Sequence, residues 1–296
     1  MTEFGKEMLF MLLKRKNKMA DYTIAFVILM AVFVCLVPFL YIFSQSLSSN
    51  RAIVSQSVTI YPIDFNIEAY KVVFADNGML YSLFYSVILT GGFVVLSLMT
   101  TILAAYPLTK KRLKGRSFFL LMMLFTMYFS GGLIPDYLNI KNLDLLNTPW
   151  ALVLPGLLNV YYMIILKSFF QSLPESLDEA AHLDGCNDLQ ILLKIVLPLS
   201  KPALATMSLL YAVFRWNYFQ DALFYITEEK YYPIQLKLYN VINISQSFVG
   251  ENVNVNLPSE ALKAAAIIFG TIPILLVYPW LQRYFVSGMM IGAVKG

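Results

Sequence analysis

Few residues in this sequence are of the types that carry out chemistry. The chain has a single histidine, His182, and two cysteines, Cys35 and Cys186. Zinc sites need three or four such ligands close together, so we predict no metal site. Asp184 and Asp188 come nearest to a carboxylate pair, but two acidic residues are too thin a basis for a membrane enzyme such as a glycosyltransferase. We therefore predict no catalytic residue.

The sequence also has no G-x-x-x-x-G-K-[ST] stretch to hold nucleotide phosphates. Energy from ATP would have to come from another chain.

Charged residues inside apolar stretches are few. Arg215 and Asp221 lie six residues apart, which places them on different faces of a continuous helix. No series of buried Asp, Glu and His is available to relay protons. Ion-coupled secondary transport is therefore disfavoured and stands as an alternative.

A polar segment, residues 175–198, is predicted to form a helical hairpin. Two pairs of its residues have the spacing of a capping box, in which each side chain satisfies a free backbone N–H at a helix start: Ser176 with Glu179, and Asn187 with Gln190. Gly185 falls between the two predicted helices, where a left-handed residue ends a helix at little cost. Pro198 and Pro202 are expected to end the second helix. This hairpin is the most structured polar segment in the sequence.

The composition indicates an all-α polytopic membrane protein. Of 296 residues, 58% are hydrophobic and 14% are charged, whereas soluble domains carry about 25% charged residues. Six apolar stretches approach the roughly 20 residues that span a bilayer, at about 23–43, 81–108, 117–135, 148–170, 203–226 and 261–281. Residues 1–19 are predicted to be a cytoplasmic or interfacial segment, and residues 20–296 a transmembrane domain.

Basic residues predict the orientation of these spans. Fifteen Lys and Arg residues fall in the termini and the even-numbered loops, against five in the odd-numbered loops. Both termini and the hairpin are therefore predicted to be cytoplasmic. The long loops at 44–80 and 227–260 would face outward, where they could contact an extracellular partner. The net charge of +4 is too small and too scattered to indicate nucleic acid binding.

The hairpin resembles the E-A-A-x-x-D-G-A…I-x-L-P loop of permease subunits of ABC importers. The residues that carry the resemblance are Glu179, Ala180, Ala181, Asp184, Gly185, Cys186, Ile195, Leu197 and Pro198. Cys186 stands where the family usually has Ala, a small change. The Trp216–Asn217 pair resembles the MalG-like branch of carbohydrate importers, and the stretch 131–135 resembles the complex-saccharide group of LplC- and YtcP-like permeases.

The resemblance implies a type I ABC importer permease in the cytoplasmic (inner) membrane of a bacterium. It implies that the hairpin is a coupling helix seated on an ATPase subunit. The implied partners are a second permease, expected to form a heterodimer, two ATPase subunits that bind ATP and Mg²⁺, and an extracellular solute-binding (lipo)protein. This chain would hold no cofactor, would lie among membrane lipids and would carry an oligosaccharide. An importer of a non-sugar solute is the alternative, because it would share the same loop.

Aromatic residues make up 15% of the chain, and the apolar faces of sugar rings stack on such side chains. Aromatic and amide residues near the resembling segments are candidates for the translocation path. These candidates are Tyr128, Asn159, Tyr161, Tyr162, Trp216, Asn217, Tyr218 and Gln220.

Overall fold

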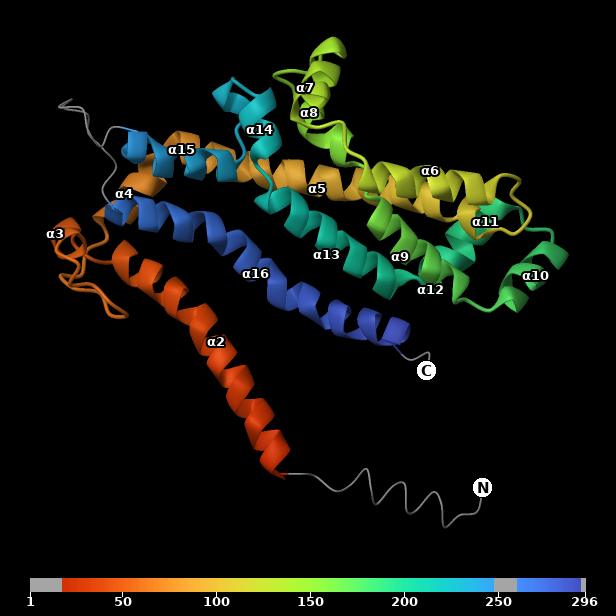
Figure 1. The fold of residues 1–296 in the computed structure, drawn as a ribbon, viewed down its shortest axis with the longest axis horizontal. Coiled ribbons are helices and arrows are strands. Elements are labelled where there is room, and N and C mark those ends of the chain that lie inside the picture. The colour runs from red at the N-terminus through yellow and green to blue at the C-terminus, as the bar shows by residue number, and fades with distance from the viewer. Residues whose placement is uncertain (1–17, 248–259, 294–296) are drawn as a thin grey trace. The chain divides into compact units, whose positions relative to one another are not determined.

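The computed structural model describes residues 18–247 and 260–293, and every regular element in these residues is a helix (Figure 1). The all-α prediction is therefore confirmed. These residues divide into two compact units: 18–72 with 260–268, and 73–247 with 269–293. The predicted N-terminal segment 1–19 lies almost entirely outside the described residues.

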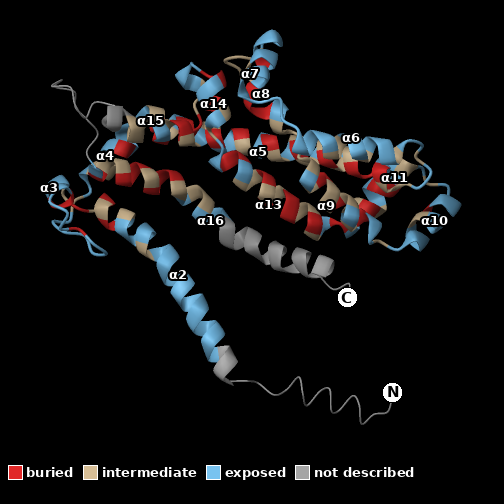
Figure 2. Ribbon diagram, viewed as in Figure 1, coloured by how far each residue is buried: buried red, intermediate tan, exposed pale blue. Residues whose placement is uncertain are grey.

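The first unit begins with α2 (Lys18–Ser46) and continues through α3 (Asn50–Val54) into the start of α4 (Glu68–Ala75). It also contains the first residues of α16 (Glu260–Ala293). A small apolar cluster of Ala52, Ile53, Val58 and Ala261 holds it together. In contrast, no residue of α2 from Tyr22 to Phe43 is buried, as Figure 2 shows. A helix that is apolar on all sides is suited to lipid.

The second unit is built around α5 (Asn77–Ala105), a continuous helix of 29 residues that is about 44 Å long. Asp76 caps its start by accepting hydrogen bonds from the backbone N–H groups of Gly78 and Met79. Its buried residues recur every three or four positions, so α5 presents one stripe to its neighbours.

The helices that follow α5 in the second unit are η1 (Pro107–Thr109), α6 (Arg116–Tyr128), α7 (Leu133–Asn142), α8 (Pro149–Val153), η2 (Leu154–Gly156), α9 (Val160–Gln171), α10 (Glu175–Leu183), α11 (Asp188–Ile191), the π-helix η3 (Leu192–Val196), α12 (Leu197–Leu199), α13 (Lys201–Asn217), α14 (Gln220–Tyr225), η4 (Glu229–Tyr231) and α15 (Ile234–Ser247). Helices α9, α13 and α15 pack on α5. Figure 1 shows α7, α8 and α14 gathered near one another, away from α10 and α11.

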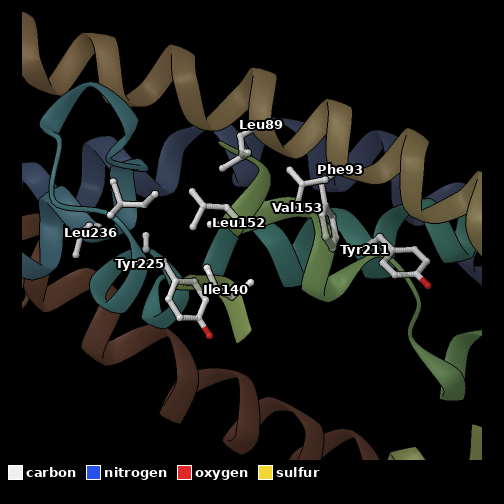
Figure 3. Packing of buried hydrophobic residues seen from close by; sticks show 11 residues of the cluster. Leu89, Phe93, Ile140, Leu152, Val153, Tyr211, Tyr225 and Leu236 are labelled. Atoms are coloured by element: carbon white, nitrogen blue, oxygen red, sulfur yellow. The ribbon is translucent and has the colours of Figure 1, made fainter. Parts of the chain in front are cut away.

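Two apolar clusters hold the second unit together. In the first, Phe93 of α5 lies edge-on to Tyr211 of α13, with ring centroids 6.0 Å apart (Figure 3). The buried hydroxyls of Thr101 and Tyr211 are 2.7 Å apart, which adds a hydrogen bond between α5 and α13. The second cluster joins the last turn of α5 to α9 and to the hairpin.

Three predicted spans correspond to single long helices. The helical segments Tyr22–Ser46, Asn77–Thr109 and Glu260–Val277 are long and apolar enough to cross a membrane. Three further candidates are bent pairs: Arg116–Tyr128 with Leu133–Asn142 at 114°, Pro149–Gly156 with Val160–Gln171 at 50°, and Asp188–Leu199 with Lys201–Asn217 at 81°. The described residues thus hold six candidate spans if each bent pair counts as one.

The breaks correct three predicted boundaries. Stretch 117–135 is interrupted after Tyr128, where Gly132 has a φ of +89°, a value that L-residues rarely adopt. Stretch 148–170 bends at 157–159, between η2 and α9. Stretch 203–226 is not one helix, because α13 ends at Asn217 and α14 is a separate short helix.

The two long loops predicted to face outward contain more helical structure than their sequence indicates. Loop 44–80 holds α3 and α4, and loop 227–260 holds α15. The start of α15 packs through Ile234 and Leu236, which are 0% and 2% exposed. Because α15 also contains several Asn and Ser residues, the composition of loop 227–260 does not indicate that one face of a helix is apolar.

Candidate functional site

The first helix of the hairpin, α10, begins one residue earlier than its predicted cap. Pro174 occupies the N-cap position, and no side chain caps the helix. Ser176 therefore lies inside the first turn, and the predicted capping box of Ser176 with Glu179 is wrong. Proline can occupy this position because no hydrogen bond within the helix uses the backbone N–H that proline lacks.

The turn between α10 and α11 is the predicted one. Gly185 has a φ of +81°. Its N–H donates to the carbonyl of His182 at 3.1 Å, and the N–H of Cys186 donates to the carbonyl of Ala181 at 2.9 Å. This pair of bonds is a Schellman motif, which satisfies the last carbonyls of α10. The left-handed glycine is thus confirmed.

The second capping box is also confirmed. The N–H of Gln190 donates to Oδ1 of Asn187 at 2.9 Å, and the N–H of Asn187 donates to Oε1 of Gln190 at 2.9 Å. The chain then passes without interruption through α11, η3 and α12 up to Leu199. Ile195 and Leu197 are partly buried in the apolar cluster beneath, whereas Pro198 is exposed.

Three basic residues of the loop between α5 and α6 pair with acidic residues of the hairpin. Lys110 lies 2.5 Å from Asp178 and Lys111 lies 2.5 Å from Glu175, both on α10. The third pair joins Arg112 to Asp188, the first residue of α11. The loop therefore holds both helices of the hairpin. In the sequence these basic residues indicate topology, and the opposite charges of the two segments are the signal from which their pairing could be predicted.

Lys110 is the most enclosed of the three cations, with a side chain that is 16% exposed. Its ammonium lies 4.8 Å from the centre of the Tyr106 ring. Burial alone would lower the pKa of Lys110, but the hydrogen bond to the Asp178 carboxylate and the nearby Tyr106 ring outweigh it, so the pKa is raised. His182 Nε2 lies 4.0 Å from Asp178 and 3.8 Å from Asp188, between the two acids.

The opposite face of α10 is exposed. Glu179, Ala180 and Leu183 share this face by their spacing of three and four residues, and Leu183 is 90% exposed. Asp184 and Gly185 at the turn are exposed too, and Cys186 is partly buried. Ala181 instead packs into the chain's own apolar cluster, at 5% exposed. The motif residues therefore divide between an outer face and an inner face.

At the junction of α13 and α14, Arg215 and Asp221 form a bidentate ion pair, with N–O distances of 2.5 and 3.0 Å. Their predicted separation onto different helix faces is wrong, because the helix ends at Asn217 and the chain turns back. Arg215 also donates to the carbonyls of Leu152, at 2.8 Å, and Tyr218, at 2.7 Å. The side chains of Arg215 and Asp221 are 2% and 11% exposed.

The predicted path residues lie at three places: the end of α6, the start of α9 and the α13–α14 junction. The exposed members are Tyr128, Tyr161, Asn217, Tyr218 and Gln220. Tyr218 stacks on Phe214, with centroids 5.2 Å apart and an angle of 18°. Phe214, which is 40% exposed, was not predicted as a path residue.

The other three candidates have roles within the chain. Asn159 caps α9 by accepting from the N–H of Tyr162 at 3.1 Å. The ring of Tyr162 packs edge-on against Tyr211 at 4.9 Å. Trp216 is 8% exposed and lines a small apolar groove with Pro273. Within the residues that the structure describes, no group of three His, Cys, Asp or Glu residues could hold a metal ion.

The sequence matches a family of known proteins over most of its length. A family model described as "Binding-protein-dependent transport system inner membrane component" matches residues 93–291. Two similar proteins come from Bacillus subtilis (strain 168). The polygalacturonan/rhamnogalacturonan transport system permease protein YtcP is 40% identical over 95% of this chain and 100% of its own length. Protein LplC is 42% identical over 89% of this chain and 90% of its own.

The fold is similar to a solved one. The crystal structure of a bacterial ABC transporter involved in the import of the acidic polysaccharide alginate contains a chain with a TM-score of 0.81 and 36% identity to this one. The match covers 92% of this chain and 98% of that chain.

Proposed function

Because this chain belongs to the family of binding-protein-dependent transport system inner membrane components, we propose that it forms part of an oligosaccharide path and receives work through the hairpin Glu175–Pro198. As a member of this family, it is a multi-pass subunit of a bacterial inner membrane and a transport component without its own ATPase site. We therefore propose that this chain contributes helices that form and move the path, while other subunits hydrolyse ATP.

The observation that carries the coupling proposal is the two-sided character of the hairpin. Its inner face is fixed by the Schellman turn, the Asn187 cap and the enclosed Lys110–Asp178 ion pair. Its outer face exposes Glu179, Ala180 and Leu183. Leu183, which is 90% exposed, is available on this face for an apolar contact with another protein. A unit braced in this way moves as one piece when a partner pushes on it.

The partners follow from the family's dependence on a binding protein. We propose a second permease of different sequence, two ATPase subunits that bind ATP and Mg²⁺, and an extracellular solute-binding lipoprotein. The loaded binding protein would dock on loops 44–80 and 227–260. ATPase closure would then displace the hairpin and open the path outward, and hydrolysis would return it.

The relatives favour an oligosaccharide with acidic sugars. One is named as a polygalacturonan/rhamnogalacturonan permease, and the similar solved transporter imports the acidic polysaccharide alginate. Relatives with lower identity are named for arabinooligosaccharides and for melibiose, raffinose and stachyose. Oligogalacturonides are therefore the first substrates to test, with neutral oligosaccharides for comparison.

We propose that the path is lined by the exposed residues of the predicted set. Tyr218 stacked on Phe214 offers an aromatic surface for a sugar ring, with the amides of Asn217 and Gln220 on either side of it in the sequence. Asn159 and Trp216 are better placed to support this surface than to touch the sugar, because their contacts lie within the chain.

The coupling role is tested by co-purification of the ATPase subunits with the permease. Leu183→Asp and Glu179→Arg are each expected to reduce recovery of the ATPases. Leu183→Asp places a charge where an apolar contact is proposed, and Glu179→Arg reverses the charge at its position on the outer face. Val54→Asp is the matched control, since Val54 is also a well-exposed apolar residue, 68% exposed, but lies on α3 in the loop 44–80. Full recovery of the ATPases with both hairpin variants would contradict the proposal.

A further inference from the structure

The loop that follows α5 is tied to the hairpin by its most enclosed cation. Lys110 comes directly after η1, which continues from the end of α5. Its ammonium pairs with Asp178 at 2.5 Å and lies 4.8 Å from the centre of the Tyr106 ring. Both contacts belong to the same side chain, so a displacement of α10 acts on the last turn of α5.

The Lys110–Asp178 pair lines a cavity between the end of α5 and the hairpin. A cavity of about 670 Å³ is lined on one side by Tyr106, Thr109 and Lys110 and on the other by Leu177, Asp178 and Ile191. Apolar contact between the last turn of α5 and the hairpin runs through the second cluster described above, whereas the open space of the cavity transmits no force. The Lys110–Asp178 pair is a direct link between its two sides. Lys111 and Glu175 also line the cavity, but their side chains are 79% and 71% exposed and their pair is open to solvent.

The other end of α5 reaches α15 in the outward loop 227–260. The backbone N–H of Ile234, at the start of α15, donates to Oγ of Ser86 at 2.7 Å, and this bond is buried. Leu89 of α5 and Leu236 of α15 belong to the same apolar cluster (Figure 3). One continuous helix therefore contacts the hairpin at one end and α15 towards the other.

We propose that Lys110 is a positioning residue that joins the hairpin to α5, and that α5 relays movement between the hairpin and α15. This proposal rests on the proposed function, because it assumes that the ATPases act on the hairpin. It adds α5 to the two helices, α9 and α13, to which the hairpin is covalently connected. Binding-protein docking outside would then reach the ATPases through α5.

The test uses the assembled complex in lipid nanodiscs, with the second permease, the ATPases and the binding protein carrying its co-purified ligand. Lys110→Glu and Asp178→Lys are each expected to keep the ATPases bound and to keep basal ATP hydrolysis. Stimulation of hydrolysis by the binding protein should fall about tenfold, a usual size for coupling between two sites. The double variant, which exchanges the charges, should restore it. Ser86→Ala should also reduce stimulation several-fold.

One further variant and a control set separate coupling from folding. Lys110→Met keeps an unbranched side chain of similar length and removes the charge, so it should fold and still lose stimulation. The matched control exchanges Lys111 and Glu175, one by one and together, and should change nothing because that pair is exposed.

The proposal is overturned if Lys110→Met and Lys110→Glu retain full stimulation, or if the exchanged double variant fails to restore what the single variants lose. Failure of the proposed function looks different, because the wild-type chain would then not retain ATPases at all, or Leu183→Asp would leave them bound.

Discussion

The ion pair of Arg215 with Asp221 gives a prediction that separates the observed broken helix from a continuous one. Asp221→Ala removes both carboxylate contacts of a guanidinium that is 2% exposed. Arg215 keeps only the carbonyls of Leu152 and Tyr218. Removal of one partner of a buried pair leaves a buried charge without compensation, which costs about 3–5 kcal/mol. We expect Asp221→Ala to lower the free energy of unfolding by that amount.

The pair itself is isolated by a double-mutant cycle with Arg215→Ala. Once the guanidinium is absent, the carboxylate has lost this partner, so the double variant should be little less stable than Arg215→Ala alone. The coupling free energy should approach about 3 kcal/mol, the upper part of the range for residues in contact. The assay is unfolding of the purified chain in mixed micelles with increasing dodecyl sulfate, followed by tryptophan fluorescence.

A parallel cycle on Lys111 and Glu175, whose side chains are 79% and 71% exposed, is the control and should give a coupling close to zero. A coupling free energy below about 0.5 kcal/mol for Arg215 and Asp221 would refute the reasoning. It would mean that the two side chains do not meet, as expected if residues 203–226 formed one helix.

Three further predictions concern the hairpin. Gly185→Ala forces an L-residue into a left-handed conformation and should lower the stability of the hairpin by about 1–2 kcal/mol, seen as faster proteolysis at the turn. Asn187→Ala removes a cap and should cost about 1 kcal/mol, seen as faster amide exchange in α11, whereas Asn187→Asp should not. The raised pKa of Lys110 means that folding stabilises its charged form, so this contribution is complete below about pH 10.5 and is lost as the pH rises through the folded value. A nitroxide on α10 should therefore become more mobile by electron paramagnetic resonance as the pH is raised above about 10.5, and in Lys110→Met it should already be mobile at neutral pH.

Sequence rules predicted local features of the hairpin well. Gly185 and the Asn187–Gln190 box were found because each depends on residues within a few positions of one another. The same rule failed at Ser176, because Pro174 two residues before it already occupies the helix start. Capping motifs compete, and the sequence alone does not say which of two adjacent starts is used.

The features that sequence reasoning missed depend on distant contacts or on a helix break. Spacing rules for Arg215 and Asp221 assume an unbroken helix, and the end of α13 at Asn217 invalidates them. The pairing of Lys110 with Asp178 joins residues 68 positions apart. Topology counting places these two segments on one side of the membrane but does not bring their side chains together. The resemblance to known permeases supplied the coupling assignment, which composition alone did not.

The bare surface of α2 has a consequence for how this helix can vary. Because no residue from Tyr22 to Phe43 is buried against the chain's own described residues, and only Val37 and Ile42 are partly buried, intramolecular fit places little demand on which apolar side chain stands at most of these positions. Solubility in hydrocarbon and contacts with neighbouring molecules are then the remaining constraints on its composition. Leucine, valine, isoleucine and phenylalanine should be interchangeable along α2 wherever lipid is the only neighbour. The buried stripe of α5, in contrast, packs against other helices of the chain, so its side chains are constrained in size and shape.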